Sequence, residues 1–355
     1  MSIKTRLLCM SYFMLLPCWC ISRDLQNQFK YFDLVNKAEL AICDSNYSTA
    51  SKMYEKAFAL PQSYSYSKDL QNYAVVSCLL NQLSKAKKCL SVLSARGCDS
   101  SWLYSLAGVE SFKEKLKAAK EFKGKLIRDN IVKIDTVKKN YFDSLYKADQ
   151  YYRGKPNAYV DFKDSIYERD RQLALELERY LGTNELPAEW ETGNSKNNFV
   201  LPSYWALIRH NMYNGQQTVN FSNYLRQALT GKRIHPYIAT ALIENSIGNL
   251  NEFRNDIVSI YIYDSAKVYL TAKRTGDPQL SEFPGVEYCI SFLAIDTNKV
   301  RAINSRRSEA GLEPLEDYKK KVAFSLKDRR FLFGFIGGIA EYFFSTRKDY
   351  LSVYN

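Results

Sequence analysis

The sequence is poor in residues that turn or break the chain. Its 355 residues contain 15 Gly and 9 Pro, and long Lys-rich stretches carry Leu and Ala at helical spacing. A sandwich or barrel of many short strands needs more turn residues than this. Hydrophobic residues make up 46% and charged residues 25% of the chain, which excludes a disordered or fibrous protein. We therefore predict an all-α protein of one large or two medium domains.

Motifs of common enzymes, metal centres and cofactor sites are also lacking. The chain has no Gly-x-Ser-x-Gly turn, no Cys-x-x-Cys pair and no His-Glu-x-x-His pair. It has only two histidines, His210 and His235. We predict no cofactor and no metal ion, and these absences favour a protein that is not an enzyme.

The N-terminus has the pattern of a secretory signal. Lys4 and Arg6 are followed by an apolar run over residues 7–22, which is too short to span a bilayer. Cleavage at the end of this run would leave a mature chain that begins at Arg23. We therefore predict a signal peptide over residues 1–22 and export to the periplasm or cell envelope of a bacterium.

Two alternatives for this segment stay open. A lipoprotein signal would acylate Cys18 or Cys20, but Pro17 and Trp19 stand before them where small residues are needed. An uncleaved membrane anchor is the second alternative, and the short apolar run suits it less well than cleavage.

An odd number of cysteines remains after this leader. They are Cys43, Cys78, Cys89, Cys98 and Cys289, so at most two bridges can form within the exported chain. The first four lie on apolar helical faces, where a thiol acts as a small apolar residue. If one pair is bridged, we expect Cys78 with Cys89.

An internal repeat appears at an offset of 36 residues (86 − 50). Small residues at matching positions of two short helices allow close approach, and larger residues fill the groove toward the next hairpin. The first set, Ala38, Ala50, Tyr54 and Ala57, recurs as Ala74, Ala86, Leu90 and Leu93. This pattern resembles the tetratricopeptide repeat, with residues 46–50 as its inter-helix turn. A third copy begins at Trp102, so we predict tetratricopeptide-like helical hairpins over residues 24–138.

Such hairpins bind a peptide or protein partner, or position a neighbouring domain. The stretch over residues 110–139 is predicted to be a charged helix. The net charge of +12 would suit an acidic partner, but these lysines come without any nucleic-acid-binding motif. We therefore predict no nucleic acid partner.

A series of short motifs marks a second, mainly helical domain over residues 139–325. It runs from Asp149-Gln150-x-x-Arg153, through an apolar helix that ends in His210 and a helix that begins after His235, to Arg306-Arg307-x-x-x-Gly-Leu-x-Pro-Leu-x-x-Tyr318. This order resembles a mainly helical bacterial domain family of unknown function, over residues 140–322. The resemblance implies that Asp149, Gln150, Arg153, His210, His235, Arg306 and Arg307 match the family's polar positions. The chain departs from the family at Arg209, at Glu244-Asn245 and at Tyr269-Leu270-Thr271-Ala272, where the family has Gln, Asp-Arg and Tyr-Gly-Thr-Gln.

The polar set supports two interpretations. In the first, His210 or His235 acts as a general base with Asp149, and Arg153, Arg306 and Arg307, with Gln150 and Tyr269, bind a small anionic group. In the second, the histidines cap helices or lie at the edge of the core, and the arginines form an ion-pair network with Asp149 and Asp296.

The C-terminal segment over residues 326–355 holds an apolar run at residues 331–344. We predict a final helix packed into the core; the alternative is a helix at an anionic membrane surface. Taken together, the sequence predicts an exported binding or scaffold protein at the cell envelope. The alternative is a hydrolase that acts on a small anionic substrate through His210, His235 and Asp149.

Overall fold

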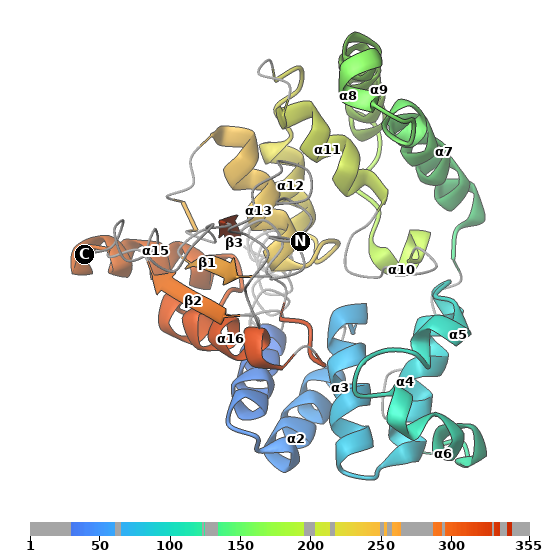
Figure 1. Cartoon of the computed structure of the whole chain (residues 1–355), viewed down its shortest axis with the longest axis vertical. Helices are drawn as coiled ribbons and strands as arrows, with labels where there is room; N and C mark the ends of the chain where they lie inside the picture. The colour runs from blue at the N-terminus through green and yellow to red at the C-terminus, as the bar shows by residue number, and fades with distance from the viewer. Residues whose placement is uncertain are drawn as a thin grey trace, which may run out of the picture.

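The computed structural model is predominantly helical, as predicted (Figure 1). It describes residues 30–60, 65–122, 124, 134–194, 203–213, 217–248, 252–253, 258–263, 287–292, 295–328, 330–333 and 339–342.

Two helical hairpins open the described chain, and they follow the predicted repeat. A helix over residues 30–43 is followed by α2 (Tyr47–Phe58), and α3 (Ser67–Leu79) is followed by α4 (Leu83–Ala95). The starts of α2 and α4 are 36 residues apart (83 − 47). The matching small residues Ala38, Ala50, Ala74 and Ala86 are all fully buried, so close helix approach explains the pattern.

The chain departs from the prediction after α4. In place of a third hairpin and one continuous charged helix over 110–139, the described residues form three short segments, α5 (Ser100–Leu103), η1 (Glu110–Phe112) and α6 (Lys113–Ala118), and the next helix begins at Thr136. Gly108 interrupts them with a φ of +80°. Lys87 of α4 then ends α6 by donating to the carbonyl oxygens of Lys117 and Ala119.

Helices of varied length form the second part of the chain. These are α7 (Thr136–Arg153), α8 (Ala158–Asp161), α9 (Lys163–Leu181), α10 (Glu189–Thr192), α11 (Ser203–Tyr213), α12 (Ser222–Thr230), α13 (Pro236–Ile247), α15 (Thr297–Glu309) and α16 (Leu315–Lys327). Helices α7, α9 and α11 contact one another, and α13 contacts α11 and α12 (Figure 1). Local chemistry sets several boundaries: His235 and Pro236 begin α13, and Gly311, at a φ of +79°, follows α15.

A small sheet was not predicted. Strands β1 (Val258–Tyr263), β2 (Glu287–Phe292) and β3 (Ile339–Tyr342) lie in the order β2-β1-β3. β1 pairs with β2 in antiparallel fashion and with β3 in parallel fashion.

The predicted C-terminal apolar helix is wrong where the segment is described. Phe331–Phe333 is not helical, and Ile339–Tyr342 is β3. Phe331 and Phe333 are both buried and stack at 6.2 Å between ring centroids. Alternate burial at spacing two suits an extended segment rather than a helix.

Among the described residues, buried hydrophobic side chains form two clusters. The first gathers residues from the hairpins together with Ala188, Trp190, Phe331 and Phe333, and the second runs from Phe142 to Val322. Within the described residues, no helix is both long enough and apolar enough to cross a membrane.

The thiols belong to the first of these clusters. Cys78, Cys89 and Cys98 are buried and Cys43 is partly buried, all of them free. The bridge considered between Cys78 and Cys89 is therefore absent, and these thiols act as small apolar side chains. The side chain of Cys289 lies outside the described residues.

Candidate functional site

The residues predicted from the motifs do not form one site. Asp149, Gln150, Arg153 and His210 come together between α7 and α11. His235 and Arg307 belong to a different, buried region, and Arg306 lies next to Arg307 on α15. Tyr269 lies outside the described residues.

The first group forms an ion-pair cluster that also includes Asp170. We call Asp149, Arg153, Asp170 and His210 the histidine–aspartate cluster. His210 Nδ1 lies 2.6 Å from Asp149 Oδ1. Arg153 Nη1 donates to the same oxygen at 3.1 Å, and its Nη2 donates to both oxygens of Asp170 at 2.8 and 2.7 Å. The amide of Gln150 donates to Asp149 Oδ2 at 2.6 Å.

One end of the cluster is buried and the other is partly exposed. The side chains of Asp149 and Asp170 are 1% exposed, whereas the ring of His210 is 21% exposed. An ionised carboxylate only accepts hydrogen bonds, so Asp149 accepts one from Nδ1 and thereby orients the ring. The cluster therefore orients one imidazole at its partly exposed end.

The sequence motifs do not include Asp170, although its position in the sequence indicates a buried, paired carboxylate. It shares the buried face of α9 with Ile166, Leu173, Ala174 and Leu177. A carboxylate on an apolar helix face needs a partner, and Arg153 is that partner.

The cluster could also be considered as a cation site. One ligand atom each from Asp149, Asp170 and His210 lie within 4.8 Å of one another, and such donors suit a divalent cation. The guanidinium of Arg153 bonds to oxygens of both carboxylates, so a cation would have to displace a buried ion pair. The same pairing leaves Arg153 little excess positive charge for an anion.

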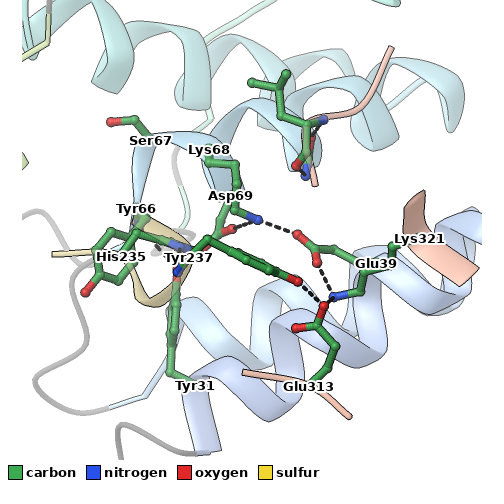
Figure 2. A network of polar contacts seen from close by, with 12 residues as sticks. Tyr31, Glu39, Tyr66, Ser67, Lys68, Asp69, His235, Tyr237, Glu313 and Lys321 are labelled. Atoms are coloured by element: carbon green, nitrogen blue, oxygen red, sulfur yellow. Dashed lines mark hydrogen bonds and ion pairs between the residues drawn. The ribbon is translucent and has the colours of Figure 1, made fainter. Parts of the chain in front are cut away.

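His235 lies in a buried network between the hairpins and the second part of the chain (Figure 2). We call Glu39, Lys68, Asp69, Arg307, Glu313 and Lys321 the central network. Lys68 bonds to Glu39 and lies 2.8 Å from Asp69, and Lys321 lies 2.5 Å from Glu39 and 3.6 Å from Glu313. Tyr31 and Tyr237 add hydroxyl donors to Asp69 and Glu313.

Three carboxylates and three cations balance in this network. Burial alone would lower the pKa of Lys68, but the attraction of Asp69 and Glu39 outweighs it and raises the pKa. Burial would raise the pKa of Asp69, but Lys68 holds it below its usual value. Glu313 behaves in the same way, with its pKa lowered by Lys321 and Arg307 against the effect of burial. All three groups are thereby kept charged.

The ring of His235 is sealed beside this network. It stacks on Tyr237 with 5.6 Å between ring centroids and meets the edge of Tyr66 at 5.0 Å. Its Nδ1 accepts the backbone N–H of Tyr237 and so caps α13. Burial and the charge of Lys68 lower the pKa of His235 to about 3. The ring is therefore neutral at physiological pH, and its role as a helix cap matches the structural interpretation.

The two neighbouring arginines bind backbone. Arg306 Nε donates to the carbonyl oxygen of Glu252 at 2.7 Å. Arg307 is fully buried and donates to the carbonyl oxygens of Glu313 and Phe253 at 2.7 and 2.8 Å. Its guanidinium also lies 4.9 Å from the ring centroid of Tyr318. Arg307 therefore ties the end of α15 to the start of α16.

Comparison with known proteins gives this chain no family. No family model matches it, and neither a curated protein nor a solved structure matches it significantly. The resemblances to the tetratricopeptide repeat and to the bacterial domain therefore stay predictions.

The buried state of His235 predicts a specific loss of stability in acid. An unfolded histidine binds a proton below a pH of about 6.5, whereas the folded ring does so only near pH 3. Between these values the unfolded state binds more protons, so stability falls as the pH falls. From about pH 6.5 to about pH 5, we expect the wild type to lose about 1–2 kcal/mol more than His235→Asn.

Asparagine is the matched replacement because it can still cap α13 but cannot titrate. Urea unfolding at a series of pH values measures the difference in slope. Parallel curves for the wild type and the variant would show that His235 is not held neutral in the fold.

Proposed function

We propose that this chain is a binding and scaffold protein in which tetratricopeptide-like hairpins hold a second helical domain. In this proposal the hairpins position the histidine–aspartate cluster, which is the binding site of the second domain. The chain acts at the bacterial cell envelope, where a peptide or protein partner and a small ligand are its binding partners.

The burial of α3 is the observation that carries this proposal. Every residue from Ser67 to Cys78 is buried, although one face of a helix in an open array of hairpins would be free. Two polar residues of this helix form hydrogen bonds with later segments. Glu189 accepts the backbone N–H of Ser67 at 2.6 Å, and the amide of Asn72 exchanges two hydrogen bonds of 2.7 Å with the backbone of Leu332.

Further bonds join the same two parts. Tyr66 donates its hydroxyl to the carbonyl oxygen of Lys232 at 3.1 Å, and Asn36 donates to Asp317 at 3.1 Å. The surface of the hairpins around α3 is thus covered by later segments of the same chain. This supports a scaffold role for the hairpins.

Removing one cation of the central network tests the scaffold role. Lys321→Met leaves Glu39 and Glu313 buried with one charge fewer to balance them, and we expect it to lower the free energy of unfolding by about 3–5 kcal/mol. Because the network joins both parts, amide hydrogen exchange should accelerate in α3 and in α13 alike.

Lys320→Met is the matched control. Lys320 also joins the two parts, through Asp44 at 2.7 Å, but both side chains are largely exposed, so we expect a loss of at most about 1 kcal/mol. Faster exchange in α16 alone after Lys321→Met would contradict the scaffold proposal.

The proposed localisation at the cell envelope depends on residues 1–22, which lie outside the described residues. If they are a cleaved signal, the mature protein recovered from a bacterial host begins at Arg23. Mass spectrometry of the N-terminal peptide measures this, and a mature protein that still begins at Met1 would contradict export by cleavage.

A second candidate function is hydrolysis of a small anionic substrate. The bond of 2.6 Å between His210 and Asp149 favours it, because a buried carboxylate that fixes the tautomer is the arrangement of a general base. In this candidate function, Nε2 of His210 takes a proton from the attacking water.

The two histidines provide an internal comparison for this candidate. His210→Asn keeps an amide that can donate to Asp149 but removes the base, whereas His235→Asn leaves the cluster untouched. With the anionic ester p-nitrophenyl phosphate as the probe, we expect turnover to fall at least about 100-fold in His210→Asn only. No turnover by the wild type, or equal turnover by the two variants, would contradict the hydrolase function. The binding proposal would then be the one that remains.

A further inference from the structure

Three aromatic rings surround the ammonium group of Lys155. Its Nζ lies 4.6 Å from the ring centroid of Tyr151, 5.2 Å from that of Tyr152 and 4.7 Å from that of Phe162. Tyr152 stacks on Phe162 at 5.6 Å, and Tyr151 meets the edge of Tyr152 at 4.9 Å. We call Tyr151, Tyr152 and Phe162 the aromatic cage.

Local chain geometry builds this cage. Tyr151 and Tyr152 lie in the last turn of α7, which Gly154 ends. Pro156 cannot continue the helix, and Asn157 takes a left-handed φ of 53°, so the chain reverses into α8. Phe162, at the junction of α8 and α9, is thereby returned to the ring of Tyr152. Figure 1 shows this elbow of α7, α8 and α9 at an outer end of the molecule.

The rings alone hold the Lys155 ammonium. In the part of the chain that the structure describes, no carboxylate forms an ion pair with it. The nearby Lys163 shows the more usual arrangement, with its ammonium over a single ring, that of Tyr167, at 5.7 Å. Three rings around one cation therefore form a distinct recognition geometry.

The cage is also accessible from solvent. Tyr151 is 59% exposed, and Tyr152, Lys155 and Phe162 are partly buried. Tyr159 and Val160, on α8, are exposed as well, so large apolar side chains gather at this elbow. An external group can thus reach the ring faces once the lysine stem moves aside.

The chemistry of the rings selects the kind of cation. A primary ammonium is strongly hydrated and keeps its hydrogen bonds to water at an exposed site. A quaternary ammonium donates no hydrogen bond, and its methyl groups carry the positive charge directly against the ring faces. It therefore gains more from three rings than lysine does.

We propose that the aromatic cage binds the quaternary ammonium group of a small ligand, with Lys155 as a tethered occupant that the ligand displaces. This site is separate from the histidine–aspartate cluster and goes beyond the binding and scaffold function proposed above. The shared chemistry is that of choline, either free or as a lipid head group.

Competition in one sample tests the proposal on the full mature chain. Choline is mixed with the uncharged alcohol in which carbon replaces its nitrogen, and saturation-transfer NMR is recorded on the methyl signals of both. Attraction to the ring faces requires the charge, so only choline should receive saturation. Equal transfer to the alcohol would overturn the proposal, because it would indicate apolar contact alone.

Removing the internal occupant sharpens the test. We expect Lys155→Ala to raise the affinity for choline by about two- to fivefold and Lys163→Ala, the matched control over a single ring, to leave it unchanged. In the Lys155→Ala background, Phe162→Leu should lower the affinity for choline by about two- to fivefold. Tyr152→Leu should have the same effect, and it serves as a second variant if Phe162→Leu does not fold. Absence of choline binding to a folded Lys155→Ala protein would overturn the proposal.

Vesicles distinguish the two sources of the ligand. Sedimentation with phosphatidylcholine but not with phosphatidylglycerol vesicles would identify the lipid head group. Binding of free choline without sedimentation would identify a free ligand, and either result supports the cage.

Discussion

The balance of buried charge in the central network is the constraint on which the rest of the structure depends. Glu39 comes from the helix over residues 30–43, Lys68 and Asp69 from α3, and Lys321 from α16. A buried charge without its partner is costly. The first and last parts of the chain must therefore meet for either to be stable, and Lys321 reaches Glu39 across 282 positions of sequence.

This network between the first and last parts of the chain explains why α3 of the hairpins is buried on all sides from Ser67 to Cys78. Small residues bring the helices of each hairpin together. Trp190 and His235 pack against Tyr66 at the start of α3, and the extended Phe331–Phe333 segment bonds to Asn72 of α3. Ser67 and Asn72 of α3 form hydrogen bonds with these later segments, so the contact is polar as well as apolar. The hairpins and the later segments are thus joined by both hydrogen bonds and buried ion pairs.

The two histidines show how surroundings decide the chemistry of one residue type. His235 is sealed among aromatic rings and cations, which lower its pKa to about 3 and restrict it to capping a helix. His210 keeps part of its ring in solvent and is oriented by a buried aspartate. Only the second environment offers a nitrogen that could exchange protons with a ligand or with water.

Local chemistry allowed the sequence by itself to predict a mainly helical fold, the first two hairpins and the start of α13. The repeat is visible in small residues such as Ala50 and Ala86, which recur 36 positions apart, and the start of α13 depends on the adjacent His235 and Pro236. Only the tertiary structure decided that His210 meets Asp149 across 61 positions, that Asp170 joins them, and that residues 331–333 are extended. The physical reason is that these partners are chosen by packing and by the need to neutralise buried charge, which depend on where distant segments lie.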